Sequence, residues 1–396
     1  MKLVRKILFW SHLVAGVSAG LVILVMSATG VLLAFEKQIV AFADRGFRSS
    51  PPAANAPSLG PEKLLPSLLA ARADAIPTSM TFRRAADAPV AVGLPKGRVV
   101  YLDAYDAHVL GEGSTSVRGF FDAVTDLHRW LALSGEGRKT ARLVTGVSNL
   151  VFLFIVLSGL YLWMPRVWTK VSVRAITWFR GGLQGRARDF NWHNTIGIWC
   201  AIPLAVVVVS AVPISFTWGS DLVLRLAGEE PQKRPTQTAN AGGASRGPAQ
   251  PDPAAWRGLD AAIAKARLQD PEWRALTVRL AGSAQAPLVV NVDSGTGGQP
   301  QKRGQLTVDR DTGEVTKWAP FSAGSAGRRA RGWLRFLHTG EALGLLGQLV
   351  AGVASLGGTV LVWTGIALAL RRLARKLSKA EAPAVFSGTE DPQLRL

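Results

Sequence analysis

Four of the five histidines in this chain lie beside long apolar segments, in two kinds of sequence surroundings. His12 and His193 each follow a phenylalanine by three positions and precede a glycine by four, at Gly16 and Gly197. The other two stand just before further apolar segments, in the phrases Thr125-Asp-Leu-His128-Arg-Trp-Leu131 and Leu334-Arg-Phe-Leu-His338-Thr-Gly340. An ionisable side chain at membrane depth is costly, so its presence beside such segments indicates function.

The chemistry that two histidine pairs allow is axial ligation of two haem irons. Neutral imidazole is a good haem ligand, and helix-bundle cores commonly hold cofactors. A structural zinc site needs four ligands in one tetrahedron, whereas helices of about 20 residues would hold the two pairs roughly 30 Å apart. Cys200 is the single cysteine, so a multi-cysteine cluster is excluded, and no Cys-x-x-Cys-His motif for covalent haem occurs. We therefore predict two b haems, with axial ligands near one membrane face, His12 and His193, and near the other, His128 and His338.

Two alternatives remain open at this point. Each histidine could only cap a helix or form a local hydrogen bond at the interface, and histidines of adjacent helices could pair instead. Arg129 and Arg335 flank the outer histidines and are expected to hold haem propionates, because arginine suits carboxylates; anchoring at the lipid surface is the alternative. His108 lies in a polar turn and is expected to be a surface residue.

Four stretches are apolar enough to cross a bilayer, whose core of about 30 Å needs roughly 20 helical residues. They run from about Ile7 to Phe35, Leu143 to Met164, Ile196 to Trp218 and Leu345 to Leu370. The first is far longer than the apolar core of a signal peptide, so we expect it to be retained.

Basic residues collect at one end of these four spans. They precede the first span, fill the loop between the second and third, and follow the fourth: Lys2, Arg5 and Lys6; Arg166, Lys170, Arg174, Arg180, Arg186 and Arg188; Arg371, Arg372, Arg375, Lys376 and Lys379. Such residues mark the cytoplasmic side, so both termini are predicted to be cytoplasmic. The net charge of +19 then follows from topology, and no nucleic-acid partner is needed to explain it.

Two long segments would face the other side, about Glu36–Thr125 and Gly219–Gly332. Each combines a helix-like stretch with an alternating strand-like run, which predicts a small α+β module. The helix-like stretches are Pro61–Arg72 and Ala261–Arg267, and the strand-like runs are Arg98–Leu110 and Gln305–Thr316. A linker composition, rich in Gly, Pro, Ala and Gln, covers Pro231–Pro253.

The two halves of the chain correspond. Gly146 and Gly159 follow His128 as Gly352 and Gly365 follow His338, with one constant offset of four residues. The predicted fold is thus an α-helical membrane protein with four transmembrane helices in two pseudo-repeats and two periplasmic α+β modules. Its predicted parts are helix 1 (1–40), module 1 (41–125), an outer His helix with helix 2 (126–166), a basic loop (167–189), helix 3 (190–218), module 2 (219–332), an outer His helix with helix 4 (333–371) and a cytoplasmic tail (372–396).

These features resemble the PepSY-associated transmembrane family, and more narrowly the ferrisiderophore reductases of the FoxB type. The residues that carry the resemblance are the His-bearing helices, Leu127-His128-Arg129-Trp130, Ser158-Gly-Leu-Tyr-Leu-Trp163 and the outside turns within Val100–Val109 and Val308–Val315. The resemblance covers about residues 1–375. It implies a bacterial inner membrane, PepSY-like modules, bis-histidine haems and reduction of a periplasmic ferric siderophore, with electrons leaving at the His128/His338 haem. Some relatives carry a flavin and nicotinamide reductase region; about twenty residues follow the last span here.

The function expected from these observations is that of a transmembrane ferric-siderophore reductase. A cytoplasmic reductase or the quinol pool would supply the electron, and the ferric chelate would be the substrate. A haem-free membrane sensor or regulator, binding a partner through its periplasmic modules, is the main rival. A secondary transporter is the third reading, although both repeats enter from the cytoplasm and the midplane lacks charged residues.

Overall fold

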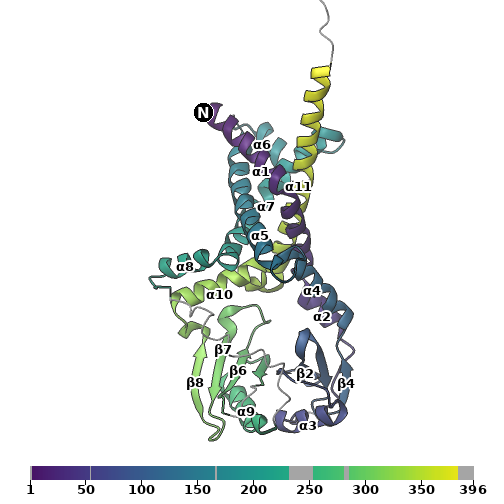
Figure 1. Ribbon diagram of the computed structural model, residues 1–396, viewed down its shortest axis with the longest axis vertical. Helices are drawn as coiled ribbons and strands as arrows, with labels where there is room; N and C mark the ends of the chain where they lie inside the picture. The colour runs from purple at the N-terminus through teal and green to yellow at the C-terminus, as the bar shows by residue number, and fades with distance from the viewer. Residues whose placement is uncertain (1, 54, 166, 232–252, 281–284, 382–396) are drawn as a thin grey trace, which may run out of the picture.

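The computed structural model describes residues 2–53, 55–165, 167–231, 253–280 and 285–381. A bundle of long helices occupies one end of the molecule and a β-sheet with two short helices the other (Figure 1). Five shorter helices lie beside or between them, α2 (Glu36–Ala43), α4 (Thr115–Trp130), α6 (Lys170–Thr177), α8 (Thr217–Leu226) and α10 (Ala326–His338). The predicted linker falls almost wholly outside the described residues.

Four helices form the bundle: α1 (Lys2–Leu33), α5 (Gly137–Trp163), α7 (Gly185–Ser215) and α11 (Gly344–Glu381). Helices α1 and α7 each pack against both α5 and α11. All four are long and apolar enough to cross a membrane, and large apolar side chains such as Leu21 and Ile202 point outward, exposed by 70% and 77%. A helix satisfies its own backbone hydrogen bonds in lipid, so these exteriors suit a multi-pass membrane protein, as predicted.

The outer histidines lie at the ends of α4 and α10, which are separate from the spanning helices. Ser114 and Ser325 cap the two helices by accepting from the amides of Val117 and Arg328, a common way to satisfy a helix N-terminus. Helix α4 ends at Trp130, and the next residue, Leu131, has a left-handed φ of 50°. Residues just after α10 turn at Gly340, where φ is 76°, and such a turn favours glycine.

Eight antiparallel strands form a single sheet in the order β4-β3-β2-β1-β5-β6-β7-β8. The strands are β1 (Ser79–Arg83), β2 (Val90–Gly93), β3 (Val99–Leu102), β4 (Val109–Glu112), β5 (Ala275–Arg279), β6 (Leu288–Asp293), β7 (Arg303–Val308) and β8 (Val315–Pro320). Helices α3 (Pro61–Ala71) and α9 (Leu259–Gln269) pack on one face. The predicted runs contain α3 and β3 and overlap α9, β4, β7 and β8, which extend beyond the predicted bounds.

The two predicted modules are corrected in one respect: they are halves of one sheet. Strand β1 pairs with β5 along its whole length, with Thr81 opposite Thr277 at the centre. A single apolar core runs under both halves and joins Leu68 and Met80 of the first to Ile263 and Val278 of the second. The two halves join because a separate four-stranded sheet would leave the backbone groups of β1 or β5 unpaired at its edge.

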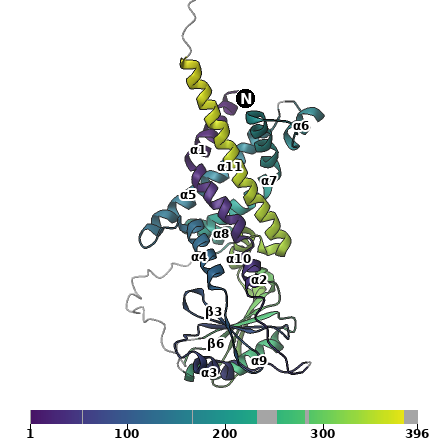
Figure 2. The same cartoon turned by 90° about the vertical axis from the view of Figure 1, so that its right-hand side faces the viewer.

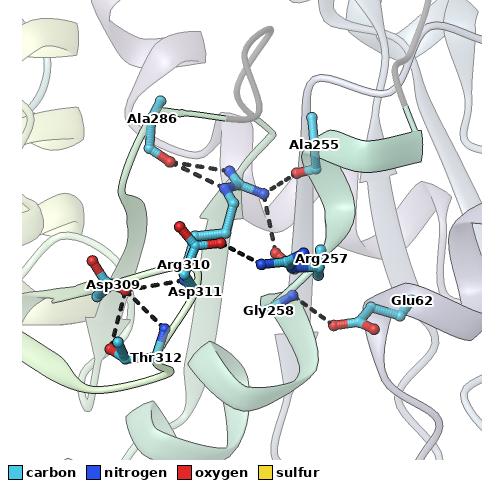
Figure 3. A network of polar contacts seen from close by, with 9 residues as sticks. All are labelled: Glu62, Ala255, Arg257, Gly258, Ala286, Asp309, Arg310, Asp311 and Thr312. Carbon is cyan, nitrogen blue, oxygen red and sulfur yellow. Dashed lines mark hydrogen bonds and ion pairs between the residues drawn. The ribbon is translucent and has the colours of Figure 1, made fainter.

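Buried Arg310 fixes the turn between β7 and β8 to the start of α9 (Figure 3). Its guanidinium donates to the carbonyl oxygens of Ala286 at 3.2 Å and Arg257 at 3.1 Å, and also to that of Ala255. A buried guanidinium is stable only when its donors are satisfied. Here carbonyls of three residues from two chain segments satisfy it, so Arg310 joins the segment before β6 to the segment before α9.

Candidate functional site

The inner histidine pair joins α1 to α7 near the ends where the basic loop and the N-terminus lie. The ring centroids of His12 and His193 are 6.5 Å apart, with an angle of 81° between the rings. Nδ1 of His12 lies 2.9 Å from the Ser158 hydroxyl on α5, and Nδ1 of His193 lies 3.0 Å from the Thr364 hydroxyl on α11. Each imidazole is therefore held by a hydroxyl from the neighbouring helix.

The outer pair joins α4 to α10 at the opposite end of the bundle. His128 and His338 have ring centroids 6.5 Å apart, at 53° to each other. Nδ1 of His128 lies 2.8 Å from the Thr29 hydroxyl on α1. Nδ1 of His338 donates to the carbonyl oxygen of Val207 on α7 at 2.9 Å. The structure thus brings together both pairs predicted from the sequence, the inner one edge-on and the outer one tilted. The pairing of adjacent helices is not the one observed.

The hydroxyl groups determine which ring nitrogen carries the proton. Thr29 donates to the Val25 carbonyl at 2.6 Å, and Thr364 donates to the Val360 carbonyl at 2.8 Å. Ser158 donates in the same way to Ile155 at 3.3 Å. A hydroxyl has one proton, so each accepts from its histidine, and Nδ1 is the protonated nitrogen. The lone pair of Nε2 is then the one available to a metal, as in second-shell arrangements around metal-binding histidines.

Two glycines give the inner histidines their space. A Cβ atom at Gly159 would lie 3.3 Å from Cε1 of His12, and one at Gly365 would lie 3.4 Å from Cε1 of His193. Each glycine directly follows the hydroxyl residue that holds the same ring. In Ser158-Gly159 and Thr364-Gly365, the hydroxyl residue therefore bonds to the imidazole and the glycine leaves room for it.

Burial keeps the outer imidazoles neutral. Burial among the surrounding helices, with smaller contributions from His338 and Arg129, lowers the pKa of His128 to about 4. Burial also lowers the pKa of His338. An imidazole must be neutral to bind a metal, so both side chains are in the form that ligation needs.

The 6.5 Å spacing of the paired rings is close to that of two imidazoles that share one metal ion. Two imidazoles that bind a metal from opposite sides through Nε2 have ring centres about 6 Å apart, because each metal–nitrogen bond is about 2 Å long. Across the described ranges, no group of three or more His, Cys, Asp or Glu side chains could hold a metal. Two protein ligands per site therefore suit an iron whose other four ligands come from a porphyrin.

Arg129 and Arg335 lie on the exposed side of the outer pair. Arg129 stacks over Trp130 and Arg335 over Phe336, with guanidinium-to-ring distances of 4.5 and 5.8 Å. Burial lowers the pKa of Arg129, and the nearby guanidinium groups of Arg142, Arg335 and Arg138 lower it further. These neighbouring positive charges favour the binding of an anion beside them. A carboxylate could therefore bind here.

Other sequence predictions can be placed as well. His108 is exposed, and its backbone carbonyl accepts from Asp103 as that of Glu314 accepts from Asp309, so it is a surface turn residue. A Cβ at Gly16 would meet no atom within 4 Å, and one at Gly197 would meet Leu361 at 3.7 Å.

The sequence did not predict the three hydroxyl residues that contact the histidines, Thr29, Ser158 and Thr364. A signal for two of them was present, since Ser158 precedes Gly159 and Thr364 precedes Gly365, the glycines at corresponding positions of the two halves.

A helical membrane bundle joined to an antiparallel α+β domain, with paired histidines at both ends of the bundle, defines the class of this protein. The chain belongs to a family described as the PepSY-associated TM region, whose model matches residues 9–372. No curated protein matches the sequence.

Proposed function

We propose that this protein is an inner-membrane reductase that holds two b haems and passes electrons from the cytoplasmic side to a ferric siderophore in the periplasm. The observation that carries the proposal is the pairing of His12 with His193 and of His128 with His338, both at 6.5 Å between ring centroids. The haem iron would supply reversible one-electron chemistry when bound.

The chain's own residues would prepare both sites for that group. The Nδ1 hydrogen bonds hold each ring and would leave Nε2 as the nitrogen that binds the iron. Gly159 and Gly365 let the inner rings lie against α5 and α11. Arg129 and Arg335 would hold the propionates of the outer haem, because they lie beside His128 and His338 in sequence. The nearest acid to Arg129, Asp126, forms its ion pair with Arg138.

The proposed orientation follows from the charge pattern and from the arrangement of the two halves. The sheet domain would be periplasmic and both termini cytoplasmic, because the basic loops lie at the opposite end of the bundle. Corresponding contacts support the proposed pseudo-repeat. Phe35 of the first half lies against Gly352, and Phe216 of the second half lies against Gly146.

The proposed reaction adds one electron to ferric iron in its chelate and yields ferrous iron. Siderophores hold ferric iron through hard oxygen donors, and the softer ferrous ion binds them less tightly. A quinol or a cytoplasmic reductase would be the electron donor. The protein would contribute the position of the two redox sites and a surface on which the chelate docks.

Absorption spectra of the purified protein test the proposal first. Two b haems per chain, with sharp low-spin bands after dithionite reduction, are expected, together with reduction of a ferric chelate. The variant His338→Ala, if it keeps the native melting profile, should lose the outer haem and the reductase activity. A stable, colourless protein after haem-replete expression would reject the proposal in favour of a haem-free sensor, and full activity in His338→Ala would reject the mechanism.

A further inference from the structure

One face of the sheet carries a row of side chains that the haem sites do not use. In the strand register, Thr81 lies opposite Thr277, Thr277 opposite Asn291, and Asn291 opposite Gln305. Side chains that pair across neighbouring strands lie on the same face, about 5 Å apart. Four hydrogen-bonding side chains therefore form a line across β1, β5, β6 and β7.

Half of this row is free to bind a ligand. The hydroxyl groups of Thr81 and Thr277 bond to each other at 3.0 Å. The amides of Asn291 and Gln305 form no side-chain hydrogen bond with any residue in the described ranges; Gln305 is exposed and Asn291 half-buried. An amide offers two donors and one acceptor, so these two side chains present unused hydrogen-bonding groups.

Cationic side chains flank the row on both sides. Arg279 lies two residues after Thr277 on β5, and Lys317 lies opposite Thr307, which is two residues after Gln305 on β7. Both are therefore on the same face as the row. Arg83 lies in the row on the other side, opposite Ala275. All three are exposed and form no ion pair with another described residue.

Two acidic side chains near this face are each paired with an arginine. Asp44, which accepts from Tyr101 in the same cross-strand row, pairs with Arg118. Asp293 lies opposite Ala275 and pairs with Arg303 at 3.6 Å. The polar sheet face, defined as Thr81, Thr277, Asn291, Gln305, Arg83, Arg279 and Lys317, is therefore positive and rich in hydrogen-bond donors.

The polar sheet face is on the side of the sheet that faces the helix bundle. Helices α3 and α9 cover the opposite face and lie at the end of the molecule away from the spanning helices, in both views (Figures 1 and 2). Phe47 and Asp44 lie over Tyr101 at the β3 end of this face. The part formed by β1, β5, β6 and β7 carries the polar row and lies on the side of the sheet where α4 and α10 carry His128 and His338.

We propose that the polar sheet face binds the ferric chelate and selects chelates of net negative charge. This inference rests on the proposed function and names its substrate class. Iron held by catecholates or hydroxycarboxylates presents anionic oxygens at the surface of the complex. Guanidinium and amide donors complement such oxygens in charge and geometry, and charge-assisted hydrogen bonds are the strongest of their kind. A neutral or cationic trihydroxamate complex would lack that attraction.

Calorimetric titration of the full-length protein in detergent with gallium(III) citrate tests the site. Gallium replaces iron because it is not reduced, so binding is read independently of electron transfer. Arg279→Gln, Arg83→Gln and Asn291→Ala should each weaken binding about tenfold, because each removes one hydrogen bond to a charged oxygen of the chelate. Arg279→Lys should retain more affinity than Arg279→Gln. The matched control is Lys265→Gln, which removes one exposed charge from α9 on the opposite side of the sheet.

Three results would overturn the inference. They are unchanged gallium citrate affinity in the double variant Arg83→Gln/Arg279→Gln with native melting, an equal loss in Lys265→Gln, and equally tight binding of a neutral gallium trihydroxamate. The inference and the proposed function can fail separately. Citrate binding at this face without chelate reduction would contradict the proposed function, whereas reduction that is indifferent to these variants would contradict the inference alone.

Discussion

At the residue scale, hydroxyl side chains determine how three of the four histidines are oriented. Thr29, Ser158 and Thr364 each bond back to a carbonyl of their own helix and accept from a histidine of another. Serine and threonine make such bonds to the preceding turn without breaking the helix. The bond uses the hydroxyl proton, so the imidazole has to be the donor.

Removing these hydroxyl groups should weaken haem binding while leaving the helices intact. We expect Ser158→Ala and Thr364→Val to lower haem affinity about 10–100-fold, the usual cost of losing a second-shell partner. The measurement is the rate at which apomyoglobin extracts haem from the purified variants. Thr359→Val is the matched control, because Thr359 bonds back to Ser355 on the same helix and to no histidine. Equal extraction rates for all of them would show that the hydroxyl groups do not support the ligands.

Glu112 should make the sheet domain sensitive to acid. Hydrogen bonds from Arg98 and then Arg72 lower the pKa of Glu112 to about 2. A carboxyl whose pKa is lowered by folding stabilises the protein above its unfolded pKa of about 4.3, and this contribution is lost as pH falls toward 2. Glu112→Gln should therefore reduce the drop in melting temperature between pH 6 and pH 3, and Glu314→Gln in an exposed turn should not. A drop as large as that of the parent protein would contradict this assignment.

The residue types of the site were accessible from the sequence, but their partners were not. Four histidines beside apolar segments indicate ligation by themselves. Which hydroxyl meets which ring depends on the rotation and register of neighbouring helices, and a single sequence does not encode that as a pattern. Ser158 and Thr364 could be suspected only because each precedes a glycine at a corresponding position.

At the element scale, α3 and α9 exchange their N-terminal caps. The backbone amide of Glu62 donates to the carboxylate of Asp260 at 2.9 Å, and the carboxylate of Glu62 accepts from the amides of Gly258 and Asp260 at 2.9 and 3.3 Å. The first amides of a helix have no partner inside it. Here each helix supplies the acceptor for the other, which ties the two halves together on the covered face of the sheet.

Truncating either cap should destabilise both halves. We expect Asp260→Ala and Glu62→Ala to cost about 1 kcal/mol each, which lowers the melting temperature by about 2–4 °C in a domain of this size. Thermal melting followed by circular dichroism measures the loss, with Glu314→Ala as the control. Because each residue caps the other helix, the double variant should lose less than the sum; strict additivity would mean that the caps act independently.

The existence of these helices followed from composition, and their mutual capping did not. Pro61 at the first helical position and the apolar spacing after it are visible in the sequence. Helix α9 is separated from α3 by nearly 200 residues, so the acceptor for Glu62 could be found only in three dimensions.

At the scale of the whole molecule, the orientation of the chain can be tested with its single cysteine removed. In a Cys200→Ser background, Lys265→Cys should react with a membrane-impermeant maleimide in spheroplasts, and Arg180→Cys only after permeabilisation. Both side chains are exposed and lie at opposite ends of the molecule, on α9 and on the loop after α6. The reverse labelling pattern would place the sheet in the cytoplasm and contradict the proposed site of chelate reduction.

The four spans and the two α+β segments could be predicted because apolar length and alternation are local signals. The joining of the two segments into one sheet could not. Strands β1 and β5 are five residues long, and nothing in such short runs specifies a partner. Only the shared core beneath them, built from both halves, makes that pairing favourable.

The seam between β1 and β5 imposes an order on biosynthesis. Thr81 and Thr277 are 196 positions apart, and two spanning helices, α5 and α7, lie between them in the chain. At about 5–20 residues per second, a ribosome needs roughly 10–40 s to cover that distance. During that interval β1 has emerged without β5, so its backbone edge is open to pairing with another chain. The nascent protein is thus most vulnerable to aggregation and proteolysis after its first half has been inserted, and that period ends when β5 reaches the same side of the membrane.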